Sequence, residues 1–348
     1  MIKYLLLFFV FNSLQKNIKA QSVPSAFTLE GKINAPEGNI RLIPMGSGFY
    51  PPGFNSDHET KVVKGNFIFK DSIYYPYPFM ILYENNVDKR GYLSGIFFID
   101  PGLQHIFCNK DSMHKTPDLE NNTMQEFLGS YHDSIHSPLN NYVRAPKDSV
   151  LFQYTNAHPN SFVALWELIF ATSERYAPIF DSIYTQFSPS LKSTYAWTIL
   201  GKRLTVVRTI SIGKIFPRLL LRDIKDLNEL KPITGFKKYT LIDFWFAHCG
   251  ACISEFPELK TIYSSYSEKG FNIVGISIDK KEMVNDWENV IKEQSLPWTQ
   301  YLDMNDKETE NLGINAFPTN FLLDENGKII QRDIEPDQLK TFLAKNLK

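Results

Sequence analysis

The sequence predicts a C-terminal α/β domain, with a central mixed sheet flanked by helices, preceded by an antiparallel β domain and a helical connector. Three features of the sequence indicate this arrangement. Short runs of alternating apolar and polar residues, separated by turn residues, extend from about residue 26 to 109. The apolar residues recur with a helical period between about 118 and 209, and strand and helix patterns alternate from about 212 onward.

The size and charge of the chain exclude some classes of protein. At 348 residues it exceeds one ordinary compact domain, so several domains are expected. The 37 Lys and Arg residues nearly balance the 38 Asp and Glu residues, which leaves a net charge of -1. Such a balance provides no field that would attract nucleic acid or an anionic membrane. We therefore expect neither as a partner.

Residues 1–20 form the pattern of a cleavable export signal. Lys3 precedes the apolar block Tyr4–Phe11, and a polar segment ends at Ala20. A bilayer span needs roughly 20 apolar residues, which neither this block nor any later run provides, so no membrane span is predicted. No cysteine lies near the cleavage region, which argues against a lipoprotein anchor. We therefore expect an exported mature protein.

Residues 21–115 are predicted to form the β domain. Turn residues separate its strands, and Lys64-Gly65 between two of them predicts a hairpin. The expected strands are Phe27–Ile33, Asn39–Ile43, Lys61–Val63, Asn66–Phe69, Phe79–Tyr83, Tyr92–Phe98 and Gln104–Cys108. Its aromatic residues could line a binding groove, but aromatics are common strand formers, so we expect Phe67, Phe69, Tyr74, Tyr75 and Tyr77 in the core and rim of the sheet.

Residues 116–209 are predicted to form the helical connector, with helices over Asn160–Thr172, Tyr176–Phe187 and Leu191–Val207. His132 and His136 stand four residues apart, as in a zinc-protease site, and Asp133 occupies the place of the glutamate base. Aspartate is one methylene too short for that role, and no third ligand is evident. We expect solvated histidines here and no metal site.

Residues 210–348 are predicted to form the α/β domain, in the order βαβα followed by a β-hairpin and a helix. A polar hairpin or loop leads to Gly235, and a loop leads to Phe317-Pro318-Thr319. The expected strands are Leu219–Leu221, Leu241–Phe246, Phe271–Ile278, Phe321–Leu323 and Lys328–Gln331. The three helices carry the apolar sets Cys252, Phe256, Leu259, Tyr263 and Tyr266, then Val284, Trp287 and Ile291, then Leu339, Phe342 and Leu343, and Gly270 is placed to cap the first.

The chain has three cysteines, too few for an exported protein held together by disulfides. Cys108, which ends a predicted strand, is expected to be a small buried apolar side chain rather than a reactive thiol. Cys249 and Cys252 form a Cys-x-x-Cys pair between a buried strand and a helix. A bridge over so short a loop stabilises the fold weakly, so this pair is expected to be functional.

A cysteine at a helix N-terminus has a stabilised thiolate, because unpaired N–H groups and partial positive charge gather there. Cys249 is predicted to be that cysteine and to attack a substrate disulfide. Cys252, shielded in the first helical turn, would then attack Cys249 and release the reduced substrate. Asp243 lies in an otherwise apolar run, and burial would raise its pKa, so it is the predicted proton acceptor for Cys252.

The segments Asp243-Phe-Trp-Phe-Ala-His-Cys-Gly-Ala-Cys252, Glu255-Phe-Pro257 and Phe317-Pro318-Thr319 resemble the thioredoxin superfamily. The Gly213–Pro217 entry and Glu255-Phe-Pro257 are similar to its exported TlpA/ResA-like branch. The resemblance covers about Ile212 to Lys348. It implies a thioredoxin-like fold, Cys249 as the nucleophile, Cys252 as the resolving thiol and a cis bond before Pro318 that faces the cysteines. A β-rich domain of unknown role ahead of such a module also resembles Gram-negative envelope proteins, which implies a periplasmic or outer-envelope location.

Several residues depart from the family pattern. His248 replaces the usual tryptophan, and an imidazolium there would lower the Cys249 pKa and make the disulfide more oxidising. A charged Asp243 would act in the opposite direction, so the redox direction stays open. Gly275 stands where thioredoxins often carry a lysine paired with the buried acid. Glu255 either tunes the site or is an exposed helix residue.

The predicted function is therefore that of a thiol–disulfide oxidoreductase, a redox-active enzyme that reduces disulfides of exported proteins and serves cell redox homeostasis. Its expected partners are protein disulfides and a redox protein that recycles the dithiol, and no cofactor or metal is predicted. A thiol peroxidase is an alternative, although Trp245-Phe-Ala-His-Cys249 lacks the threonine of a Pro-x-x-x-Thr-x-x-Cys frame. A non-catalytic envelope protein that binds a ligand, or a metal such as copper at the cysteines and His248, is another.

Overall fold

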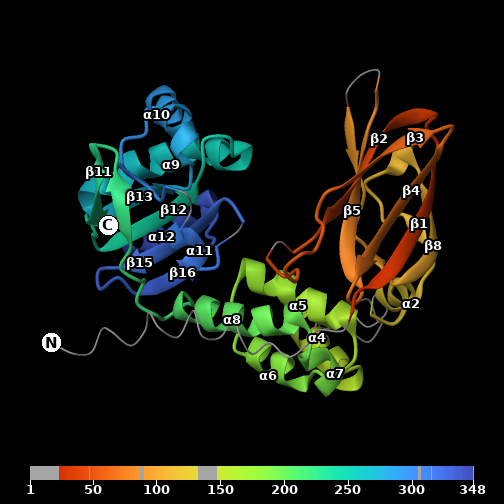
Figure 1. Ribbon diagram of the computed structural model, residues 1–348. Coiled ribbons are helices and arrows are strands. Elements are labelled where there is room, and N and C mark those ends of the chain that lie inside the picture. Colours follow the sequence, from red (N-terminus) through yellow and green to blue (C-terminus); the bar gives the residue numbers. More distant parts are fainter. Residues whose placement is uncertain are drawn as a thin grey trace. The chain divides into compact units, whose positions relative to one another are not determined.

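A computed structural model describes residues 23–46, 48–86, 90–131, 147–304, 307–314 and 316–347 (Figure 1). The chain divides into two compact units, one with the residues up to 170 together with 179–201, the other with 171–178 and the residues from 202 onward. The predicted export signal and the pair His132 and His136 lie outside the described residues. The division into four segments stays a prediction.

The first unit contains a β-sheet of nine strands, coloured red to yellow in Figure 1. Eight of them follow the order β6-β5-β2-β3-β4-β1-β8-β9, and β7 pairs with β5. The pairs are antiparallel except β1 with β8, which run parallel, so the predicted antiparallel character does not extend to this pair. The strands are β1 Ser25–Ile33, β2 Glu37–Pro44, β3 His58–Val63, β4 Asn66–Ile73, β5 Tyr77–Glu84, β6 Gly91–Leu93, β7 Phe97–Ile99, β8 Gly102–Cys108 and β9 Asp118–Leu119.

The predicted strand Tyr92–Phe98 is wrong in part: its two ends belong to β6 and β7, but the chain leaves the strand conformation between them. The hydroxyl of Ser94 accepts a hydrogen bond from the backbone N–H of Ile81 at 2.7 Å. At Gly95, a Cβ would stand 2.6 Å from the backbone nitrogen of Thr116, so the close approach of that segment requires glycine. The break is thus imposed by a segment some twenty residues away in the chain.

The hairpin predicted at Lys64-Gly65 is confirmed: Val63 pairs with Asn66, and both turn residues have positive φ. Of the aromatic residues expected in the core and rim of the sheet, Phe67 and Phe69 lie in β4 and Tyr77 lies in β5, whereas Tyr74 and Tyr75 lie between these two strands. Phe67, Phe69, Tyr75 and Tyr77 are buried, whereas Tyr74 is partly exposed. Cys108 is buried as well, and burial raises its thiol pKa to about 12, as expected for an unreactive side chain.

Helices follow the first sheet in the chain. They are α2 Asn122–Gln125, the π-helical η3 Glu126–Tyr131, α4 Lys147–Ala157, α5 Phe162–Glu174, α6 Ile179–Gln186, α7 Pro189–Lys192 and α8 Tyr195–Thr209, with the short 3-10 segment η2 Lys110–Ser112 ahead of them. The helix expected over Tyr176–Phe187 starts later, because Pro178 disfavours helical conformation in the residue before it. The helix expected over Leu191–Val207 is divided into α7 and α8, since the hydroxyl of Thr194 accepts the backbone N–H of Trp197 and starts a new helix.

The second unit contains a mixed sheet in the order β11-β10-β14-β13-β12-β15-β16. Strands β12, β13 and β14 run parallel, and the other neighbours are antiparallel. The strands are β10 Leu220–Asp223, β11 Asp226–Pro232, β12 Tyr239–Trp245, β13 Phe271–Ser277, β14 Thr299–Leu302, β15 Thr319–Asp324 and β16 Ile329–Arg332. The helices are α9 Gly250–Tyr266, α10 Val284–Glu293, α11 Lys307–Asn311 and α12 Pro336–Asn346, with the short 3-10 segments η5 Ser267–Lys269 and η6 Lys281–Met283.

Alternate residues of β12 face opposite sides of this sheet. Leu241 and Trp245 belong to a buried cluster that includes residues of α9, α10 and α12. Ile242 and Phe244 belong to a second cluster, formed on the other face with residues such as Phe216. This alternation follows from the two-residue period of a strand, and it explains why a strand buried on both faces is apolar throughout.

The loop predicted between α10 and Phe317 is wrong in part, because it contains β14 and α11. Strand β14 has four residues and lies between β10 and β13, where it is buried from Gln300 to Leu302. So short a segment with a polar residue at its centre gives no distinct strand pattern. Gly270, as predicted, has positive φ and ends the helical region after α9, although a short turn of 3-10 helix, η5, precedes it.

None of the helices within the described ranges is long and apolar enough to cross a membrane.

Candidate redox-active site

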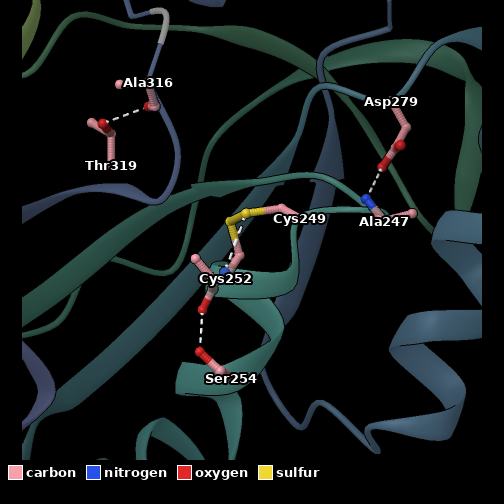
Figure 2. Close-up of a disulfide and its surroundings, with 8 residues drawn as sticks. Ala247, Cys249, Cys252, Ser254, Asp279, Ala316 and Thr319 are labelled. Carbon is pink, nitrogen blue, oxygen red and sulfur yellow. Dashed lines mark hydrogen bonds between the residues drawn. A yellow bond between two sulfur atoms is a disulfide. The ribbon is translucent and has the colours of Figure 1, made fainter. Parts of the chain in front are cut away.

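Strand β12 carries the chain to the cysteines, which stand at the start of α9 and are joined by a disulfide (Figure 2). The backbone N–H of Cys249 donates to the carbonyl of Phe246 at 3.0 Å, which closes a tight turn after the strand. Cys249 is the N-cap of α9, and its Sγ accepts the backbone N–H of Cys252 at 3.2 Å. The predicted placement of the pair at a helix N-terminus is therefore confirmed.

Both cysteines are buried in the oxidised state. Cys249 is 5% exposed and Cys252 is 1% exposed, so Cys249 is the more accessible of the two by a small margin. The order agrees with the predicted shielding of Cys252 inside the first helical turn. Cys252 also belongs to the buried cluster that contains Trp245 and Phe256.

Asp279 holds the segment before the cysteines in place. Its Oδ2 accepts the backbone N–H of Ala247 at 2.9 Å (Figure 2). The same oxygen accepts the hydroxyl of Ser277 at 2.6 Å. Asp279 is nearly completely buried, and this burial raises its pKa in spite of the two hydrogen bonds. A buried carboxyl thus ties the turn that carries Cys249 to the end of the neighbouring strand.

His248 points toward solvent and toward α10. Its Nε2 lies 3.1 Å from Oδ2 of Asp286, and the side chains of both residues are half exposed or more. Exposed ion pairs of this kind contribute little to stability. The nearby carboxylate would nevertheless offset part of the positive charge that a protonated imidazole presents to Cys249.

Asp243 lies behind the dithiol, on the face of β12 that α9 covers, because its neighbours at two-residue spacing, Leu241 and Trp245, pack in the same cluster as Cys252. The residue is 3% exposed. Burial raises its pKa to about 7, and the charge of Glu255 adds to this effect. The expectation of a buried acid with a raised pKa is therefore met.

Glu255 is partly buried on α9, so it is not the exposed helix residue that the sequence offered as one of two interpretations. Burial raises its pKa, and the charges of Glu335 and Glu258 raise it further. Because Glu255 in turn acts on Asp243, the two carboxyls are electrostatically linked. An acid on the helix and an acid on the strand thus oppose each other's ionisation.

The peptide bond between Phe317 and Pro318 is cis, as the family resemblance implies. Strand β15 begins at the next residue, Thr319, and pairs with Phe244 at the end of β12 that leads to the cysteines. The ring of Phe317 meets the ring of Phe246 edge to face, with 5.7 Å between centroids. Pro318 is therefore at the same end of the sheet as Cys249.

No group of three or more His, Cys, Asp or Glu side chains that could hold a metal ion occurs among the residues that the structure describes. Both cysteines are engaged in the disulfide, and His248 is paired with Asp286.

Asp279 and Asp286 were not predicted from the sequence. Asp279 follows β13 directly, and β13 runs parallel to β12, so its place at the carboxyl end of the neighbouring strand was a usable signal. Asp286 lies on a helix surface among other charged residues, and nothing in the sequence distinguished it.

The fold and the site together define a class of protein. A mixed sheet whose central parallel strand leads into a Cys-x-x-Cys disulfide at a helix N-terminus, with a cis-proline at the start of the adjacent strand, is the arrangement of a thioredoxin-like domain. The model of the Redoxin family matches residues 212–345.

Comparison with known proteins narrows this class. Over 159 residues the chain is 31% identical to a thiol–disulfide oxidoreductase ResA of Bacillus cereus, a match that covers 45% of this chain and 89% of the relative. A second ResA, from Bacillus thuringiensis, is 29% identical over 44% of this chain and 86% of its own length. The crystal structure of the thioredoxin domain of a Bacteroides vulgatus thiol–disulfide oxidoreductase is 34% identical, covers 40% of this chain and 99% of that one, and has a TM-score of 0.36. Through its C-terminal domain the chain belongs to the ResA-like family of thiol–disulfide oxidoreductases.

Proposed function

We propose that this oxidoreductase reduces disulfides of exported proteins through Cys249 and Cys252. The observation that supports this most directly is the position of Cys249 as the N-cap of α9, where its sulfur accepts a backbone N–H. That hydrogen bond and the positive end of the helix would stabilise a thiolate at Cys249 more than one at Cys252.

The reaction has two exchange steps. The Cys249 thiolate attacks one sulfur of the substrate disulfide, forms a mixed disulfide and releases the other substrate sulfur as a thiolate. Cys252 then loses its proton and attacks Sγ of Cys249, which forms the Cys249–Cys252 bond and releases the second substrate thiol. Two electrons pass from the dithiol to the substrate, and a separate redox protein must then reduce the Cys249–Cys252 disulfide back to the dithiol.

Asp243 is the proposed acceptor of the Cys252 proton. It lies on the face of β12 that packs against the helix of Cys252, and its raised pKa, about 7, suits a group that takes up and releases a proton near neutral pH. Glu255 supports this role because its charge raises the pKa of Asp243. His248 would tune the thiolate of Cys249 from the other side.

The position of Pro318, just before β15 and at the same end of the sheet as Cys249, supports a site for an extended substrate segment. Backbone groups before β15 would pair with a substrate strand, which aligns its disulfide with Cys249. The export pattern of residues 1–20 supports substrates outside the cytoplasm. The β-rich domain ahead of the redox domain resembles Gram-negative envelope proteins, which supports a location in the periplasm or outer envelope of such a bacterium.

A trapping experiment tests this proposal. The Cys252→Ser variant, reduced and mixed with a disulfide-bonded protein, should accumulate a mixed disulfide on Cys249 that mass spectrometry detects. Cys249→Ser should not accumulate it, and Cys108→Ala should turn over like the wild type. The proposal would be contradicted if the wild-type protein reduced no disulfide, or if it consumed peroxide faster than it reduced disulfides.

The reduction potential of the pair tests its direction. A value near about -270 mV, as in thioredoxin, supports a reductase, whereas a value near about -120 mV is that of a strong oxidant and would reverse the proposed direction.

A further inference from the structure

Gln300 of β14 lies in the same row of the sheet as Asp243. Asp243 pairs with Gly275 of β13, and Gly275 pairs with Gln300. Residues in register on parallel strands point to the same face, so Gln300 and Asp243 share the face that α9 covers. The row therefore places an amide two strands away from the buried acid.

The side chain of Gln300 fills the space that Gly275 leaves empty. Its Cδ and Nε2 lie 2.7 Å and 2.8 Å from the position that a Cβ of Gly275 would occupy, and its Oε1 lies closer still. Neighbouring strands are about 4.8 Å apart, so an amide above Gly275 is one strand spacing nearer to Asp243 than the backbone of Gln300 is. A larger residue at position 275 would exclude this arrangement.

The orientation of the amide is determined by Trp245. The indole Nε1–H of Trp245 can only donate, and Oε1 of Gln300 accepts it at 3.1 Å. Trp245 is two residues after Asp243 on the same face of β12. The oxygen of the amide is thus engaged by Trp245, and the nitrogen remains available to donate to another group.

Nε2 of Gln300 is a buried donor with no hydrogen-bond partner in the part of the chain that the structure describes. Gln300 is 1% exposed. Leaving a buried donor unpaired destabilises a fold, so a donor at this place, beside a buried acid, calls for a partner.

We propose that Gln300 is a positioning residue that donates from Nε2, directly or through one water, to the carboxylate of Asp243 when Asp243 releases its proton. It would act through Asp243 and would not contact the substrate. This inference rests on the proposed function, because Asp243 is the proposed acceptor of the Cys252 proton.

Among the described residues, the other groups around Asp243 are less suited to this role. Glu255 of α9 is an acid that opposes ionisation of Asp243, and the cysteines of α9 are joined in the disulfide. Asn320, which pairs with Asp243 from β15, is held in place at both ends of its amide, because Nδ2 donates to the carbonyl of Ile334 and Oδ1 accepts the backbone N–H of the same residue. Glu335 acts on Glu255.

The first test follows the carboxyl carbon of Asp243 by NMR in the oxidised protein, where no thiol chemistry interferes. A donor stabilises the carboxylate, so its removal in Gln300→Met should raise the titration midpoint of Asp243 by about one pH unit. Gln300→Glu keeps an acceptor for Trp245 but replaces the donor with a carboxyl oxygen, and should raise the midpoint at least as far. The matched control Asn272→Leu, which loses another buried amide of the same sheet, should leave it unchanged.

The second test separates the two exchange steps with Ellman's reagent. The first aryl thiolate is released when Cys249 attacks, and the second when Cys252 attacks Cys249. Gln300→Met should shift the pH midpoint of the second release upward and leave that of the first unchanged. Unchanged NMR and kinetic midpoints, or an equal shift in Asn272→Leu, would overturn the role of Gln300. A wild-type protein without a Cys252-dependent second release would instead overturn the proposed function, while the NMR result would still stand.

Discussion

The carboxyl of Asp279 accepts the backbone N–H of Ala247 at 2.9 Å, two residues before the first cysteine. The strand next to β12 therefore supports the turn on which Cys249 is carried. The stability of the domain and the redox behaviour of the dithiol are therefore both expected to depend on Asp279.

Replacing Asp279 should change both properties. Asp279→Ala leaves the buried N–H of Ala247 unpaired and removes the acceptor of the Ser277 hydroxyl, so we expect a loss of about 1–3 kcal/mol in the free energy of unfolding. Removing a carboxyl near the cysteines should also make the disulfide more oxidising, by up to about 30 mV in equilibrium with glutathione.

Asp303 provides the matched control. It is also buried, and its Oδ2 accepts the backbone N–H of Thr309 at 2.7 Å and its hydroxyl at 2.6 Å. Asp303→Ala should destabilise the domain by a similar amount and leave the potential unchanged. Equal shifts of potential in the two variants would show that Asp279 has no special link to the dithiol.

The buried acid should make stability depend on pH. Folding raises the pKa of Asp243 to about 7, whereas an unfolded aspartate titrates near about 3.9. Between these values the folded state holds a proton that the unfolded state has released, so the free energy of unfolding falls as pH rises. Three pKa units correspond to about 4 kcal/mol.

Asp243→Asn should remove this fall. In urea denaturation of the oxidised protein, its stability relative to wild type should be higher at pH 8 than at pH 4 by up to about 4 kcal/mol. Glu255→Gln should reduce the fall without abolishing it, because burial is the larger cause of the raised pKa. A difference between Asp243→Asn and wild type that does not vary with pH would refute the assignment.

His248 should have a small effect on the potential. An imidazolium near Cys249 favours the thiolate, so His248→Ala should make the potential more negative, but by less than about 30 mV because Asp286 shares its charge. The shift should shrink further in high salt, which screens exposed charges. A shift in the other direction would mean that His248 does not stabilise the thiolate.

Thiol counting tests the isolation of Cys108. Its burial and its raised pKa, about 12, predict no rapid reaction with Ellman's reagent in the native oxidised protein and one reactive thiol after denaturation in urea. Cys108→Ala should abolish that thiol and leave the reduction potential unchanged. A native oxidised protein that reacts at once would place Cys108 at an accessible position.

Some features of this protein could be predicted because their causes are local. A buried strand that runs into Cys-x-x-Cys at the start of an apolar helical stripe places Cys249 at the N-terminus of α9. Lys64 and Gly65 adopt positive φ and form the expected hairpin. The raised pKa of Asp243 also follows from its apolar neighbours along the strand. The cis bond before Pro318 was reached by family resemblance.

Other features depend on contacts between distant segments, and the tertiary structure alone decided them. The break at Gly95 is imposed by Thr116, and β14 exists because β10 and β13 pair with it on either side. Gln300 can reach across Gly275 only after three strands come into register, and Asp279 meets Ala247 only where two parallel strands end together. The sequence by itself determined where the dithiol lies along the chain and which helix carries it. The surroundings of the dithiol were decided by the packing of segments that no short-range pattern links, because hydrogen bonds and burial depend on position in space.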